Sequence, residues 1–209
     1  MLTSIIKKTV MALTGVFLSL FIVVHVFGNS TILFGKDAFL SYAAKLHSLG
    51  VFISLFEVML LSMFVIHVLL ALQTYCENLY ARPERYCVKK TSGGRTPGSR
   101  TMPYTGLFIL IFLVFHLNDF HFRDETVLIS DIVGHTLQRP MKVIFYVCAL
   151  VALTLHISHG FWSIFQTLGL NHPKYNRFIR KTTILVSLVI GVLFISIPLA
   201  VFYYNLLVV

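Results

Sequence analysis

The chain has 209 residues, of which 57% are hydrophobic and only 12% are charged. An ordinary soluble domain carries about 25% charged residues, so this composition excludes one. The formal net charge of +9 does not indicate nucleic-acid binding, because the basic residues lie between long apolar stretches, where membrane topology explains them. We therefore expect an integral membrane protein that does not bind nucleic acid.

Apolar stretches that are long enough to cross a bilayer recur along the chain. They predict an all-α bundle of five transmembrane helices, which forms one membrane domain over residues 1–209. The spans lie near 10–34, 49–75, 103–121, 141–168 and 182–208. The first stretch has no signal-cleavage site and is expected to remain as the first span. Residues 76–102 are expected to form a loop, in which 91–100 are too polar and too rich in Gly and Pro for a helix.

The basic residues predict the direction of every span. Twelve of the seventeen lie on the side of the N-terminus and five on the other side. The twelve are Lys7, Lys8, Arg82, Arg85, Lys89, Lys90, Arg95, Arg100, Lys174, Arg177, Arg180 and Lys181, and the five are Lys36, Lys45, Arg123, Arg139 and Lys142. The positive-inside rule then places the N-terminus and the loop 76–102 in the cytoplasm and the C-terminus outside.

The three cysteines, Cys76, Cys87 and Cys148, form neither a CxxC pair nor a CxxCH motif. Their spacing therefore indicates neither a zinc site nor covalent attachment of haem.

The first and third predicted spans repeat one pattern, in which Thr-Gly is followed by a histidine ten residues after the glycine. The residues are Thr14, Gly15 and His25 in the first span, and Thr105, Gly106 and His116 in the third. Both spans run outward, so His25 and His116 are expected at one depth in the outer half of the membrane. Two imidazole rings can then face each other across the bundle.

The second and fourth spans run inward and carry His67 and His156 past their midpoints, in the inner half. Ten residues of helix rise about 15 Å. Gly15 and Gly106 are therefore expected near the depth of this inner histidine pair, where the missing Cβ lets a flat macrocycle approach the backbone.

Four histidines on four helices at two matching depths predict two b-type haems, each held between paired imidazoles. A single intramembrane histidine could be an interhelical hydrogen-bonding group instead. His159 is the rival ligand, because it lies three residues after His156 on nearly the same helix face. The remaining histidines, His47, His121, His135 and His172, lie at span ends or in connections, where solvated histidines are ordinary.

These patterns resemble the dihaem cytochrome b membrane anchor of the succinate:quinone oxidoreductases, in the form where one polypeptide carries both haems. The resemblance covers nearly the whole chain. It is carried by Thr14-Gly15 through His25, Ser30-Thr31-Ile32-Leu33-Phe34-Gly35, His67, Thr105-Gly106 through His116-Leu117, and His156-Ile157-Ser158-His159-Gly160-Phe161-Trp162. It implies that His25 and His116 ligate the outer haem and that His67 and His156 ligate the inner haem, with His159 at a non-ligand position.

The resemblance also implies partners and a place in metabolism. An iron–sulfur subunit and a flavoprotein subunit dock on the cytoplasmic face in this family, so no fumarate site is expected in this chain. The run from Ser30 to Gly35 is closer to menaquinol-oxidising fumarate reductases than to succinate dehydrogenases. This implies a menaquinol:fumarate reductase of anaerobic respiration in a bacterial inner membrane, for which a dimer of the heterotrimer is one arrangement.

Two residues are candidate proton acceptors for quinol oxidation near the outer haem. In the resembled fumarate reductases an acidic residue after the first span takes this proton, and its position is occupied here by His47. Glu57 lies ten residues before His67 and is a carboxylate inside a span, which is costly and needs a reason. Asn118, Asp119 and His121 cluster at the outer end of the third span. In some relatives a glutamate returns protons across the membrane, and this chain has Thr154 at its position. We therefore expect this proton pathway to be missing.

Three alternatives stay open at this point. The same subunit could serve a succinate dehydrogenase that reduces quinone. The chain could also be another dihaem b protein, such as a transmembrane reductase that acts alone. A third class is a haem-free, proton-coupled transporter whose histidines relay protons.

Overall fold

The computed structural model describes residues 3–81, 97–123 and 126–207, and within these ranges the chain forms seven α-helices and one short 3-10 helix. Five helices are long and apolar enough to cross a membrane. They are α1 (Ser4–Ser30), α3 (Val51–Tyr80), α4 (Pro97–Phe120), α6 (Pro140–Thr167) and α7 (Pro173–Tyr204). The prediction of an all-helical chain with five helices able to cross a membrane is confirmed, which is consistent with a multi-pass membrane protein.

The long helices extend beyond several of the predicted spans. α3 continues to Tyr80 and α4 begins at Pro97, so the predicted loop 76–102 is too long at both ends. In particular, residues 97–100 are helical although a non-helical segment was predicted over 91–100; residues 82–96 lie outside the described part of the chain. Proline suits the first turn of a helix, because its missing N–H is not needed there and its fixed φ already suits the helix. The same reason explains why α7 begins at Pro173.

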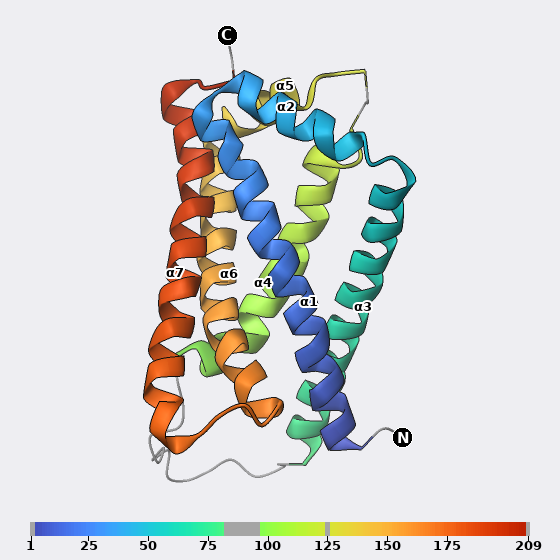
Figure 1. Ribbon diagram of the computed structural model, residues 1–209, viewed down its shortest axis with the longest axis vertical. Coiled ribbons are helices and arrows are strands. Elements are labelled where there is room, and N and C mark those ends of the chain that lie inside the picture. Colours follow the sequence, from blue (N-terminus) through green and yellow to red (C-terminus); the bar gives the residue numbers. More distant parts are fainter. Residues whose placement is uncertain (1–2, 82–96, 124–125, 208–209) are drawn as a thin grey trace.

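Two antiparallel helix pairs make up most of the bundle (Figure 1). α1 packs against α3, and α4 packs against α6, which in turn packs against α7. α1 also contacts α6 and α7, so it joins the two pairs. α1, α4 and α7 run in one direction, and the two ends of the chain lie at opposite ends of the bundle.

One end of the bundle is covered by two short helices that the hydrophobic pattern did not predict, α2 (Lys36–His47) and α5 (Ile129–Leu137). We call this the outer end and the opposite one the inner end. The 3-10 helix η1 (Thr31–Phe34) continues α1 up to Gly35, whose φ of +104° suits glycine and turns the chain into α2. The Lys36 ammonium donates to the Asp131 carboxylate at 2.9 Å and holds the pKa of that carboxyl below its usual value. This ion pair joins α2 to α5.

Much of the buried core lies in the outer half of the bundle. It includes Val26 and Ile32, Leu137 of α5, and Val201 near the end of α7. The Gln138 amide donates to the Val201 carbonyl at 2.9 Å, which ties the end of α5 to α7. By contrast, Leu70 is the one buried residue among the described residues of α3. That helix therefore contributes little to the protein's own core.

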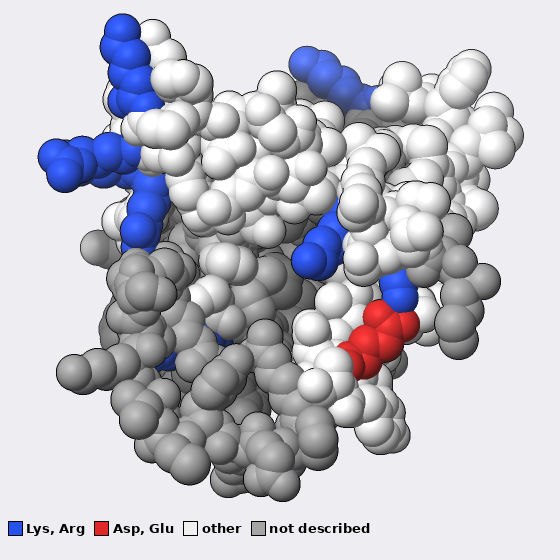
Figure 2. Space-filling view, turned by 90° about the horizontal axis from the view of Figure 1, so that it is seen from below, with Lys and Arg blue, Asp and Glu red and all other residues white. Residues whose placement is uncertain are grey.

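At the inner end, several basic side chains are exposed among the described residues (Figure 2). The Lys7 ammonium, which is buried, donates to both carboxylate oxygens of Glu77 at 2.5 and 2.6 Å, and the Gln73 amide donates to the same carboxylate at 3.0 Å. This ion pair joins α1 to α3 below the level of their histidines.

Candidate functional site

His25 on α1 and His116 on α4 face each other in the outer half of the bundle. Their ring centroids are 5.9 Å apart and their planes are inclined at 81°. The two histidines come from helices that run in the same direction, and each follows a Thr-Gly pair at the same spacing, so the repeat has placed them at one level. The structure thus brings together the two residues that were predicted as the outer pair.

Aromatic side chains enclose this outer pair. Phe21 stacks on His25 at a centroid distance of 5.0 Å, and Phe120 lies edge-on to His116 at 5.2 Å. Tyr146 of α6 also contacts the His116 ring, at 6.1 Å. The Nδ1 atom of His116 is buried and has no hydrogen-bond partner among the described residues. The rings of both histidines therefore lie among aromatic side chains.

His67 on α3 is held by Thr14 of α1. The distance from the Thr14 Oγ1 to the His67 Nδ1 is 3.1 Å, and the same hydroxyl lies 3.0 Å from the carbonyl oxygens of Val10 and Met11. A hydroxyl has one proton, and we assign it to these carbonyls. The ring then donates its Nδ1–H to Thr14, and its Nε2 keeps a free lone pair.

His156 on α6 is held in the same way by Thr105 of α4. The Thr105 Oγ1 lies 3.3 Å from the His156 Nδ1, and 3.0 and 3.2 Å from the carbonyl oxygens of Thr101 and Met102. The two helix pairs, α1 with α3 and α4 with α6, therefore repeat one device, in which a buried threonine on the first helix selects the ring tautomer of a histidine on the second.

The glycines of the Thr-Gly pairs face the rings of the same histidines. A Cβ on Gly15 would lie 3.6 Å from the Cε1 atom of His67, and a Cβ on Gly106 would lie 3.4 Å from the Cε1 atom of His156. The predicted depth of both glycines is thus confirmed. A Cβ at these distances would make only ordinary van der Waals contact, so the imidazole rings do not themselves require glycine here. Whether the two glycines admit a macrocycle stays a prediction.

The other histidines take different positions. A Cβ on Gly98 would meet the His159 Cβ at 2.9 Å, so His159 lies against the first turn of α4. His172 caps the start of α7 by accepting from the backbone N–H of Lys174 at 3.3 Å. His47 is exposed at the end of α2, with its Nδ1 2.9 Å from the Ala43 carbonyl of its own helix.

Glu57, the other predicted proton acceptor, lies at the outer end of α3. One of its carboxylate oxygens is 4.0 Å from the Nδ1 of His121, which follows α4. Both side chains are about half exposed, at 49% and 48%. The preceding residue, Phe56, contacts Phe21 at 6.3 Å, and Phe21 stacks on His25. A short aromatic chain therefore connects the Glu57 region to the outer histidine pair.

Asp119 lies on the other side of the outer pair and is almost fully buried, at 2% exposure. It accepts two hydrogen bonds from the Lys142 ammonium, at 2.6 and 2.7 Å, and one from the Tyr146 hydroxyl at 3.0 Å. The Nη2 atom of Arg123 lies 3.7 Å from the Oδ1 atom of Asp119. These bonds tie α4 to α6 directly beside His116.

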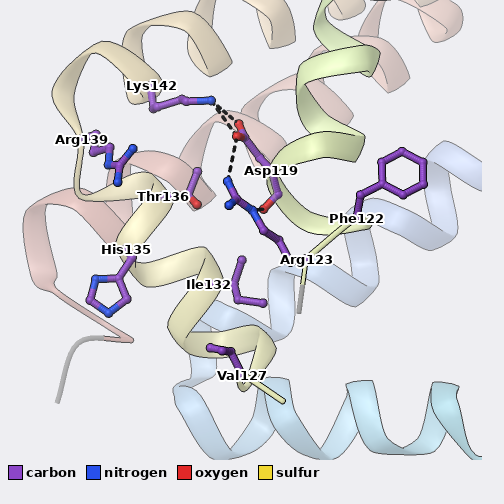
Figure 3. A pocket seen from close by; sticks show the side chains of 9 residues that line it. All are labelled: Asp119, Phe122, Arg123, Val127, Ile132, His135, Thr136, Arg139 and Lys142. Carbon is purple, nitrogen blue, oxygen red and sulfur yellow. Dashed lines mark hydrogen bonds and ion pairs between the residues drawn. The ribbon is translucent and has the colours of Figure 1, made fainter. Parts of the chain in front are cut away.

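A pocket of about 410 Å³ opens next to Asp119, between the end of α4, α5 and the start of α6 (Figure 3). Arg139, Thr136 and His135 also line it. Because Asp119 is already bound to two cations, its carboxylate is poorly suited to accept a proton from a ligand in this pocket. Glu57, with its nearest described partner beyond hydrogen-bonding distance, is better suited.

Sequence reasoning missed two features of these sites. The Thr-Gly repeat did not by itself identify threonine as the partner of the inner histidines, although the recurrence of threonine eleven residues before each outer histidine was the available signal. The partners of Asp119 on α6, Lys142 and Tyr146, had no signal in the sequence.

Within the described ranges, no group of three or more His, Cys, Asp or Glu side chains is arranged to hold a metal ion. Haem needs only two protein ligands, because the porphyrin supplies the other four, so paired histidines suit it.

A comparison of this chain with protein-family models, with curated proteins and with solved structures finds no match.

Proposed function

We propose that this chain is the dihaem cytochrome b membrane anchor of a quinol:fumarate reductase. In this proposal it oxidises menaquinol and passes electrons through two bis-histidine haems to iron–sulfur and flavin subunits on the cytoplasmic side. The observation that carries the proposal is the placement of four histidines as two sets on four helices, an outer facing pair and an inner pair with matched threonine partners.

The geometry of the outer pair fits a haem iron. Metal–imidazole nitrogen bonds are about 2 Å long, so the centroids of two imidazoles on opposite faces of one metal ion lie about 6 Å apart. The centroids of His25 and His116 are separated by 5.9 Å. The aromatic side chains around them would exclude water from the group that they hold.

The hydrogen bonds of the inner pair fit the same chemistry. An imidazole that ligates a metal through one nitrogen donates its other N–H to a partner, which fixes the ring tautomer. Thr14 and Thr105 provide such partners to His67 and His156, and both rings would present Nε2 to the iron. The haems, when bound, would supply one-electron carriers; the protein supplies the ligands, their orientation and a dry environment.

We infer that Glu57 accepts a proton from quinol at the outer end, with His121 as its neighbour. Its carboxylate has free lone pairs, it is half exposed, and the Phe56–Phe21 contacts connect it to His25. A quinol bound there would lose its proton toward the outer surface. His47 is less well placed, because its ring is exposed and hydrogen-bonds its own helix.

The deciding experiment is a reduced-minus-oxidised spectrum and a haem assay of the purified full-length chain, which should give two haem b per chain. His67→Ala and His156→Ala should lose the same spectral component, and His25→Ala and His116→Ala the other. His159→Ala is the matched control on α6 and should retain both haems. A chain without haem would exclude the proposal, and loss of the same component in His67→Ala and His116→Ala would show that the pairing is wrong.

A further inference from the structure

A second pocket lies at the inner end of the bundle, between the end of α6 and the start of α7. It has a volume of about 350 Å³ and is formed by six side chains. They are Trp162, Asn176, Arg177, Arg180, Lys181 and Ile184. None of these residues takes part in the histidine sites.

The pocket is strongly cationic, and none of the described residues that line it is acidic. Arg177, Arg180 and Lys181 follow one another over little more than one turn of α7, and all three are exposed. No acidic residue follows Asp131 in the sequence, so neither wall of the pocket can supply a carboxylate. At the inner end of the described chain, Glu77 is already paired with Lys7. Among the described residues, no carboxylate therefore pairs with these three cations.

A polar group inside the pocket also lacks a partner. The Oδ1 atom of Asn176 is buried and makes no hydrogen bond to any described residue. Buried polar atoms are almost always hydrogen-bonded, so an unpaired amide here indicates a missing partner. Rotation of the Asn176 side-chain amide exchanges its oxygen and nitrogen atoms. In the rotated position the amide can donate its N–H groups to a phosphate.

The walls on the membrane side of the pocket are apolar. Ile184 lies one turn deeper along α7 than Arg180, where the hydrophobic part of the helix begins. Trp162 lines the pocket from α6. Tryptophan is enriched where membrane and water meet. In the view of the inner end, basic side chains gather at the edge of the molecule on the side of α7 (Figure 2). The pocket thus joins a cationic rim to an apolar wall at the depth of lipid headgroups.

We propose that this pocket binds the phosphate group of an anionic phospholipid, with its acyl chains along Ile184 and Trp162. Basic pockets between transmembrane helices on the cytoplasmic side bind such headgroups. A soluble protein partner would use the cations but not the apolar wall, and free phosphate would have no use for that wall either. The proposal does not depend on haem.

The test uses the purified full-length chain in neutral detergent, with phosphatidylglycerol added and phosphatidylcholine as the neutral lipid. Affinity is measured from the rise of the unfolding temperature with lipid concentration and from lipid retention in native mass spectrometry. One cation near a membrane surface contributes about fivefold in affinity, so Arg177→Gln combined with Arg180→Gln should weaken phosphatidylglycerol binding about thirtyfold. Arg177→Lys with Arg180→Lys should keep most of it.

Lys174→Gln is the matched control, because Lys174 lies at the same end of α7 but outside the pocket, with its ammonium over the Tyr175 ring. It should leave the affinity unchanged. If the double glutamine variant fails to fold, Arg180→Gln alone should show about a fivefold loss. Equal losses in the control and pocket variants would overturn the proposal, as would unchanged affinity in the pocket variants. Binding of inorganic phosphate as tight as that of the lipid would also overturn it.

Discussion

At the scale of single residues, the threonines of the Thr-Gly pairs carry the most specific chemistry in the molecule. Each is buried and uses its own proton on backbone carbonyls, so it can only accept from the histidine beside it. A hydroxyl is a neutral acceptor, unlike a carboxylate. It selects the ring tautomer without adding a charge to a part of the protein where charge is costly.

Thr14→Val and Thr105→Val remove this acceptor while keeping the size of the side chain. Loss of a partner beyond the metal ligands typically weakens metal binding by about 10- to 100-fold. We expect each variant to weaken retention of the inner haem by at least about tenfold and to leave the outer haem in place, as measured by haem content and redox titration. Thr14→Ser and Thr105→Ser should restore retention. Equal loss in the serine and valine variants would mean that the threonines act through packing alone.

The two candidate proton acceptors can be separated by substitution. Glu57→Gln should keep both haems and dye-driven fumarate reduction by the soluble subunits, but lower quinol-dependent reduction by at least about tenfold, the low end of the loss expected for a positioned base. His47→Ala should remain near the parental rate, because its ring is exposed and bonded to its own helix. The opposite result would return the assignment to His47. Parental rates in both variants would direct attention to Asp119 and His121.

At the scale of helices, the contact between α6 and α7 depends on a glycine. A Cβ on Gly191 would collide with the Oγ1 and Cγ2 atoms of Thr154. The Thr154 hydroxyl donates to the Leu150 carbonyl at 2.8 Å, so this short side chain is held in place. Small residues let membrane helices approach closely. Thr154, where some resembled proteins have glutamate, therefore lies in a tight contact between α6 and α7.

Gly191→Ala should lower the free energy of unfolding by about 1–3 kcal/mol, the usual cost of overpacking. The two helices must separate, because the colliding atoms lie close to the backbone of α6. Gly160→Ala is the control on α6, since a Cβ there would meet nothing within 4 Å. Unfolding in mixed micelles should show destabilisation in the first variant and none in the second. Equal stability of the two would show that α6 and α7 can adjust at this contact.

At the scale of the whole molecule, two antiparallel helix pairs of the same design are joined through α1. Each pair contributes one histidine to the outer level and one to the inner level, so each proposed haem would join the two pairs. α3, which contributes little to the buried core, would gain a partner in this way. The stability of the bundle and the binding of its haems would then depend on each other.

The orientation in the membrane is testable on the intact chain. Because five spans place the termini on opposite sides and the basic residues gather toward the N-terminal side, the N-terminus should be cytoplasmic. A fluorescent protein that folds only in the cytoplasm should fluoresce when fused to the N-terminus but not to the C-terminus. Alkaline phosphatase, which is active only outside, should be active at the C-terminus. The reverse pattern would invert the outer and inner ends.

The sequence by itself determined the five spans, their alternating direction and the matching depths of the histidines. These properties are local, because hydrophobic length decides whether a segment crosses a bilayer and the helical rise converts residue spacing into depth. The ends of the helices were less predictable. First turns built from proline, glycine and polar residues, such as those that begin at Pro97 and Pro173, continue a helix without any apolar signal.

Only the tertiary structure decided which side chains meet across helices. Thr14 with His67, Glu57 with His121, and Asp119 with Lys142 are contacts between segments that lie 23 or more residues apart. It also decided that α2 and α5 cover the outer end, where the Lys36–Asp131 ion pair joins them. Such contacts depend on the rotation and crossing of packed helices, which are set by side-chain packing over the whole bundle and leave no periodic trace in the sequence.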